Sequence, residues 1–169
     1  VLEDMVFATY PANELVFERG DLQPGEMFIL EGIVRTYLSD SEGREVTLNI
    51  HVGPCTFTPS IGREMDSISR VDCASLSETR VARFSTDNLI KCMMDNSAVQ
   101  KWGDAVLRNE LVLRADREWA LAALPGLERL QQFRERYPGL EDQIPHYHIA
   151  SYLGLTPVTL SRLRSQSLS

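Results

Sequence analysis

Residues that could contact nucleic acid gather near the C-terminal end of this sequence. In a helix that begins at Pro157, the outward surface carries Val158, the small polar residues Thr159, Ser161 and Ser165, and Arg162. Hydroxyl groups and arginine suit base edges and phosphates in a major groove, where Arg162 can form a bidentate pair with guanine. We therefore assign DNA contacts to Thr156, Val158, Thr159, Ser161, Arg162 and Arg164, with Arg164 on the DNA backbone.

Two short helices joined by a tight turn must hold these residues. Pro145 suits a first helical position, and Gly154 suits the left-handed residue that follows a helix. Thr156 is then an N-cap with Pro157 at the first position of the next helix. Helices joined so closely cross steeply, which predicts a helix-turn-helix with a common core of Ile149, Leu153, Leu155, Leu160 and Leu163. The alternative is a helical pair that serves only packing.

Other chemistry finds little support in the sequence. No nucleophile-elbow, zinc-protease, phosphate-loop or dinucleotide motif occurs, so we predict no enzyme activity and assign no catalytic or metal-binding residue. His146 and His148 are two positions apart and point in different directions on a helix. The three widely spaced cysteines, Cys55, Cys73 and Cys92, are typical of small hydrophobes rather than a disulfide framework. A haem or redox sensor stays an alternative, because a lone histidine or cysteine can ligate iron.

The distribution of charge suggests two roles in one chain. The 169 residues have a formal net charge of −7 and are 43% hydrophobic, which is the balance of a globular protein. Residues 126–169 nevertheless hold five arginines and four acidic residues, and no acidic residue follows Asp142. No apolar run approaches the roughly 20 residues of a membrane span, and the cysteine content favours a cytoplasmic protein.

The first half of the chain is typical of short strands. Turn residues at about ten-residue spacing favour an antiparallel sandwich or barrel. The expected strands are Glu14–Arg19, Met27–Leu30, Val34–Leu38, Val46–Ile50 and Arg80–Phe84.

Helices follow the strands. Ser85 is the expected N-cap of a helix through about Asn96, and a long helix then covers Ser97–Leu124. The long helix carries two apolar stripes, one with Val99, Trp102, Val106, Leu113 and Ala120, the other with Leu107, Leu111, Ala115, Trp119 and Ala122. We assign a dimer seam to Val99, Trp102, Val106 and Leu113; the alternative is a wholly intramolecular helix. A further short helix is expected over Leu127–Tyr137.

The chain resembles the Crp/Fnr-type bacterial transcription regulators along most of its length. The segment Ile149–Arg164 looks like their DNA-reading motif, and Gly20-Asp21, Ile29–Gly32, Val34–Tyr37 and Gly43–Leu48 resemble their cyclic-nucleotide-binding β-roll. The resemblance implies an α+β fold: an antiparallel β-roll (a jelly-roll-like double-stranded β-helix) over 1–86, helices including the dimerisation helix over 87–124, and a helix-turn-helix over 125–169. It implies a homodimer on a palindromic operator, with RNA polymerase as a candidate further partner.

The sequence departs from that family at the expected effector pocket. Relatives that bind cyclic AMP carry a Gly-Glu pair for the ribose and an Arg-Ser or Arg-Thr pair for the phosphate. Here Phe57 and Thr58 stand in the first region without a carboxylate, and Ser69-Arg70 is a reversed form of the second. We assign the effector pocket to these four residues and expect weak or no cyclic AMP binding. Only five residues follow Arg164, too few for the β-hairpin wing of the family.

The sequence thus predicts a dimeric DNA-binding transcription regulator whose roll senses an unknown small molecule other than cyclic AMP. No cofactor is assigned. One alternative is a sensory or scaffold module that retains the roll with little or no DNA binding. Another is a small-molecule-binding protein without a regulatory role.

Overall fold

The computed structural model describes residues 5–22, 25–57 and 68–166. Two four-stranded antiparallel sheets form the N-terminal half, in the orders β1-β8-β3-β6 and β2-β7-β4-β5. The strands are β1 (Val6–Tyr10), β2 (Leu15–Phe17), β3 (Gly25–Glu31), β4 (Ile33–Ser39), β5 (Glu45–Val52), β6 (Cys55–Phe57), β7 (Asp72–Ser75) and β8 (Thr79–Ser85). This confirms the predicted antiparallel roll.

The inner faces of the two sheets bury one apolar cluster. It includes Phe17, Ile29, Val34, Cys73 and Val81, so the prediction of a buried hydrophobic cysteine is confirmed for Cys73. Gly32 makes the sharp connection from β3 to β4 with a φ of +94°, and a Cβ there would lie 2.3 Å from the Glu78 carbonyl oxygen. A larger residue at this position would therefore push this connection away from the backbone at the start of β8.

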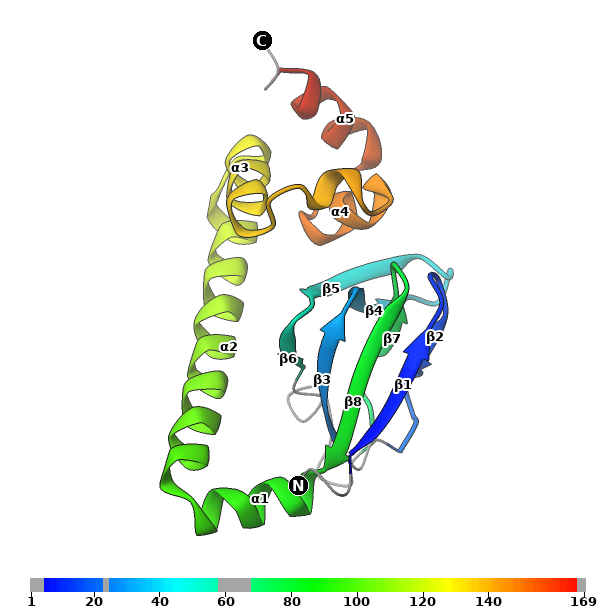
Figure 1. The fold of residues 1–169 in the computed structure, drawn as a ribbon. Helices are drawn as coiled ribbons and strands as arrows, with labels where there is room; N and C mark the ends of the chain where they lie inside the picture. Colours follow the sequence, from blue (N-terminus) through cyan, green and yellow to red (C-terminus); the bar gives the residue numbers. More distant parts are fainter. Residues whose placement is uncertain (1–4, 23–24, 58–67, 167–169) are drawn as a thin grey trace.

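Helices make up the rest of the chain (Figure 1). They are α1 (Thr86–Asp95), α2 (Ser97–Ala123), α3 (Gly126–Arg136), a short 3-10 helix (Leu140–Asp142), α4 (His146–Tyr152) and α5 (Pro157–Gln166). The 27 residues of α2 give it a length of about 40 Å. The Asn96 side chain caps α2 by accepting hydrogen bonds from the Ala98 and Val99 backbone N–H groups. Pro145 immediately precedes α4 rather than occupying its first position.

The helix-turn-helix has the predicted local structure. Gly154 adopts a φ of +63°, and the Thr156 hydroxyl accepts a hydrogen bond from the Thr159 backbone N–H at 3.1 Å. Ile149, Leu153 and Leu160 are buried, while Leu155 and Leu163 pack against them partly buried. The predicted common core of the motif is therefore confirmed.

The β-roll and the C-terminal helices share a second hydrophobic core. Ile33, Ile50 and Leu76 of the roll belong to the same buried cluster as Leu130, Phe133, Leu140, Ile144, Ile149, Ala150, Tyr152, Leu153 and Leu160. Figure 1 shows α4 above β5, while α2 runs along the side of the roll nearest β6 and β3. The roll therefore holds the helix-turn-helix directly, in addition to the covalent link through α2 and α3.

Candidate functional site

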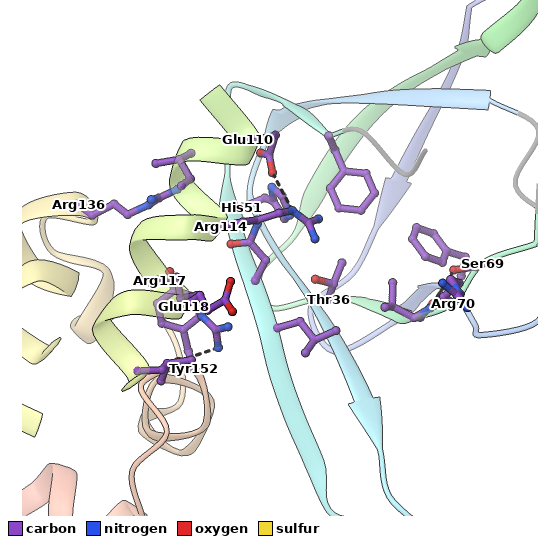
Figure 2. Close-up of a pocket in the computed structure, with 17 residues that line it drawn as sticks. Thr36, His51, Ser69, Arg70, Glu110, Arg114, Arg117, Glu118, Arg136 and Tyr152 are labelled. Atoms are coloured by element: carbon purple, nitrogen blue, oxygen red, sulfur yellow. Dashed lines mark hydrogen bonds and ion pairs between the residues drawn. The ribbon is translucent and has the colours of Figure 1, made fainter. Parts of the chain in front are cut away.

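A cavity of about 420 Å³ lies between the β-roll, α2 and the helix-turn-helix. The roll contributes Phe17, Thr36, Leu48, Asn49, His51, Phe57, Ser69, Arg70 and Val71 to its lining. The helices contribute Glu110, Leu113, Arg114, Arg117, Glu118, Leu121, Arg136 and Tyr152. Figure 2 shows α2 supplying one wall and β5 the opposite one. A cavity of this size, with both apolar and charged walls, suits a small-molecule ligand.

The charged side chains of the cavity are mainly positive. Among the described residues that line it, four are arginines and two are glutamates. Arg114 lies 3.8 Å from Glu110, measured from Nε to Oε2, which is too long for a hydrogen bond. Burial and the positive charges of Arg114 and Arg136 lower the pKa of His51 to about 3. His51 is thus a neutral imidazole at physiological pH, and its ring packs edge-on against Phe57 at 4.7 Å.

Arg117 joins three elements at one end of the cavity. Its Nη2 donates to the backbone carbonyl of Thr47 on β5 at 3.1 Å and to that of Tyr152 on α4 at 3.0 Å. The guanidinium also lies over the Tyr152 ring, 4.7 Å from its centroid. Its Nε is buried without a hydrogen-bond partner among the described residues.

The predicted effector-pocket residues are only partly brought together. Phe57, Ser69 and Arg70 all line the cavity, whereas Thr58 lies outside the described residues. The Ser69 hydroxyl is buried and donates to the Val71 carbonyl at 2.7 Å, so it is committed to its own loop. Arg70 is exposed. The described part of the roll therefore lacks the paired donors and the carboxylate that a cyclic nucleotide would need.

The predicted DNA-contacting face is exposed on α5. Thr156, Val158, Thr159, Ser161 and Arg162 are all exposed, with Val158 at 61% of its maximal accessible surface. The hydroxyls of Thr156 and Thr159 bond each other at 2.9 Å. Because Leu160 turns inward and is buried, the polar residues beside it point away from the protein.

Arg164 has a different environment from Arg162. Its Nε lies 3.0 Å from Glu141 Oε1, and its Nη1 lies 3.0 Å from His146 Nδ1. The Glu141 side chain is only 13% exposed and also pairs with Arg134. Arg164 therefore ties α5 to the 3-10 helix, and a DNA phosphate would have to compete with Glu141 for it.

The predicted seam residues of α2 lie on its inner side. Val99, Val106 and Leu113 are half-buried, and the Trp102 ring lies 5.9 Å from the ring of Phe28 on β3. Val106 and Leu113 also line a smaller cavity together with Cys55 and His51 of the roll. The most exposed apolar residues of α2 are instead Leu107 (44%), Leu111 (65%), Val112 (57%) and Trp119 (57%).

Comparison with models of known sequence families identifies the family of this chain. The model described as the cyclic nucleotide-binding domain matches residues 7–96, slightly more than half of the chain. The chain belongs to this family. The matched segment runs from β1 to the end of α1, so the cyclic nucleotide-binding domain provides the whole roll and one wall of the cavity. A search of curated protein sequences returned no match.

Solved structures share the fold over nearly the full chain. FixK2 from Bradyrhizobium japonicum has a TM-score of 0.81 at 23% identity, covering 96% of this chain and 83% of its own. CooA from Carboxydothermus hydrogenoformans, a variant form, has a TM-score of 0.78 at 20% identity and coverages of 98% and 77%. The catabolite activator protein of Thermus thermophilus has a TM-score of 0.57 at 21% identity and coverages of 98% and 79%. The resemblance to Crp/Fnr-type regulators is confirmed.

Within the described residues, no helix has the length and hydropathy that a membrane span requires. In the same part of the chain, no group of three or more histidine, cysteine, aspartate or glutamate side chains could hold a metal ion.

Arg114, Arg117, Arg136 and His51 line the cavity although the sequence interpretation did not assign them to it. A spacing of three between Arg114 and Arg117 indicates a shared helix face, which was the available signal. Their orientation toward the roll depends on how α2 packs, and Arg136 reaches the cavity from a different helix. Neither fact can be read from local spacing.

Proposed function

We propose that the protein is a DNA-binding transcription regulator that acts as a homodimer and responds to a small molecule other than cyclic AMP. The observation that carries this proposal is the exposed polar face of α5, held on a buried helix-turn-helix core and free of acidic residues. Arg162 can pair with guanine, and the exposed Val158 can contact a thymine methyl group. The Thermus thermophilus neighbour, a catabolite activator protein, supports the regulatory reading through its fold.

Homodimerisation is supported by the outer face of α2. Leu107, Leu111 and Trp119 form an exposed apolar stripe there, together with Ala115 and Ala122. An exposed apolar stripe of this length on a soluble protein marks an interaction surface. We therefore place the proposed seam on this outer stripe, while the inner stripe with Val106 packs on the protein's own roll. A twofold axis along α2 would present two copies of α5 to the two half-sites of a palindrome.

Sensing of a small molecule is supported by the cavity between the roll and α2. The cavity touches α2, α3 and α4, so an occupant would contact the elements that carry the helix-turn-helix. The described roll offers neither the carboxylate for a ribose nor an aligned Arg-Ser pair for a cyclic phosphate. The proposed effector is therefore not cyclic AMP.

Selection of DNA from a randomised duplex pool tests the proposal. At low salt the protein should enrich a roughly palindromic duplex, and affinity should fall steeply as salt is added because phosphate contacts release counterions. A matched selection with Arg162→Ala should lose preference at one base pair of each half-site. If no duplex is enriched at low salt, with or without candidate effectors, the reading of a sensory module without DNA binding replaces this proposal.

A further inference from the structure

The helical wall of the cavity carries three arginines. Arg114 and Arg117 project from α2 and Arg136 from α3, and all three line the cavity together with residues of β5. This cluster occurs in a chain whose formal charge is −7. Three arginines converging on one cavity repel one another, and such an arrangement is favourable when an anion binds between them.

The carboxylates of the cavity leave two of these three arginines without a salt bridge. Arg117 and Arg136 form no salt bridge with a described carboxylate. Glu110 approaches only Arg114, at 3.8 Å. Burial is the main cause of the lowered pKa of His51, and the positive charges of Arg114 and Arg136 lower it further.

The remainder of the lining mixes apolar and polar side chains. Its apolar side chains are Phe17, Leu48, Phe57 and Val71 of the roll and Leu113 and Leu121 of α2. An occupant that matches both the arginines and these apolar side chains therefore has one anionic group and an apolar body. Guanidinium groups bind carboxylates and phosphates through charge-assisted hydrogen bonds.

We propose that the cavity binds a small carboxylate or phosphate ester with an apolar body, whose anionic group is held by Arg114, Arg117 and Arg136 of the helices. The anion subsite then belongs to α2 and α3, and not to the roll loop that carries Arg70. This inference rests on the effector role proposed for the cavity and is independent of whether α5 binds DNA.

Calorimetric titration of the full chain with three probes tests the inference: phenyl phosphate, phenylacetate and the neutral phenylacetamide. Both anions should bind, and phenylacetamide should bind at least about tenfold more weakly than phenylacetate, because it lacks charge-assisted hydrogen bonds. Added salt should weaken the two anions and leave the amide nearly unchanged.

Single substitutions locate the subsite. Arg114→Gln and Arg136→Gln should each weaken phenyl phosphate about tenfold or more. Both side chains lie at exposed positions, so the variants are expected to fold, and thermal unfolding checks this. Arg108→Gln is the matched control, since Arg108 is exposed on the same helix and does not line the cavity. If one variant fails to fold, the other variant and the comparison of phenylacetate with phenylacetamide still test whether the arginines bind the anion.

Several results would overturn the inference. They are the absence of binding by either anion at millimolar concentration, equal affinity for the acid and the amide, or equal losses in Arg108→Gln and Arg136→Gln. Cyclic AMP serves as a further probe: tight binding abolished by Arg70→Gln but not by Arg136→Gln would place the anion subsite on the roll instead. None of these outcomes bears on selection of DNA, so failure here is distinguishable from failure of the proposed DNA binding.

Discussion

Two arginines on α5, two positions apart, have different surroundings and should have different roles. Arg162 is exposed and makes no hydrogen bond or ion pair with a described residue. Arg164 is bound to Glu141 and to His146, with 31% of its side chain exposed. An arginine that is paired with a largely buried carboxylate stabilises the fold. An arginine without such a partner can instead bind a base edge.

We expect Arg162→Ala to cost about 1–3 kcal/mol of affinity for the selected duplex and to relax specificity at one base pair. Arg164→Ala should instead lower the stability of the fold by about 1 kcal/mol, because Glu141 loses one of its two arginine partners. Fluorescence anisotropy with the selected duplex measures the first effect and thermal unfolding the second. The assignment is contradicted if Arg164→Ala changes base preference and Arg162→Ala does not.

His148 links the stability of the fold to pH. It is 3% exposed, and burial together with the charge of Arg35 lowers its pKa to about 4, against an opposing effect of Glu45. In the unfolded chain the imidazole has a pKa near 6.5, so between about pH 4 and 6.5 the unfolded state binds a proton that the folded state does not. The contribution of neutral His148 to the free energy of unfolding should therefore be fully present above about pH 6.5. It should be lost as the pH drops toward 4.

Thermal unfolding between pH 7.5 and 4.5 measures this effect. His51 acts in the same direction, because its pKa is also lowered. We expect a loss of the order of 2–3 kcal/mol for a shift of this size, and a shallower pH dependence in His148→Gln. His146→Gln removes an exposed imidazole from the same helix and should retain most of the slope. An identical slope in wild type and His148→Gln would exclude this role for His148.

At the scale of elements, α2 has an inner and an outer face with different functions. The inner face carries Trp102, Val106 and Leu113 toward the roll, together with the arginines of the cavity. The outer face carries the apolar stripe of Leu107, Leu111 and Trp119. This division explains why the sequence shows two apolar stripes on one helix, since each has its own packing partner in the proposed dimer.

Leu111→Asp should convert the proposed dimer to a monomer, because it places a charge against its symmetry mate at the centre of the outer stripe. The control is Ala105→Asp, an exposed position about 120° around the same helix from Leu111. Analytical ultracentrifugation at micromolar concentration measures the result. Wild-type protein that sediments as a monomer, or a Leu111→Asp variant that sediments as a dimer, would remove α2 as the seam.

The sequence predicts elements with strong local signals and misses those defined by long-range pairing. The cap at Thr156, the left-handed Gly154 and the apolar spacing of α5 are all local, and all are found. The β6 and β7 strands have only three and four residues, and their strand character depends on pairing with β3, β2 and β4. A short strand of this kind has too few residues to show an alternating pattern.

In the candidate site, too, contacts between residues far apart in the sequence could not be predicted. Arg164 and Glu141 are 23 positions apart, and their contact follows from how α5 packs on the 3-10 helix. The residue types at the DNA-reading face could be read from sequence, but the engagement of Arg164 could not. Three of the four cavity arginines come from α2 and α3, and they line one cavity only because of how both helices are placed beside the roll.

At the scale of the whole molecule, the roll and the helix-turn-helix are joined through edge strand β5. The Ser151 hydroxyl of α4 accepts a hydrogen bond from the Thr47 backbone N–H at 2.8 Å and donates to the Glu45 carbonyl at 3.2 Å. Tyr137 donates from its hydroxyl to the Ile50 carbonyl at 3.0 Å. Arg117 adds contacts to both sides of this junction at the wall of the cavity. A ligand in the cavity would thus touch the connection between the roll and the helix-turn-helix.

Protection of guanine N7 atoms on the selected duplex tests whether a dimer places α5 in the major groove of each half-site, because N7 lies in that groove. A twofold dimer should give two symmetric groups of protected guanines, centred about one helical turn or 34 Å apart. The same duplex bound by Arg162→Ala should lose protection at one guanine in each half-site. The proposed binding of α5 in the major groove would be contradicted by absence of N7 protection, by a single unpaired protected region, or by a pattern that Arg162→Ala leaves unchanged.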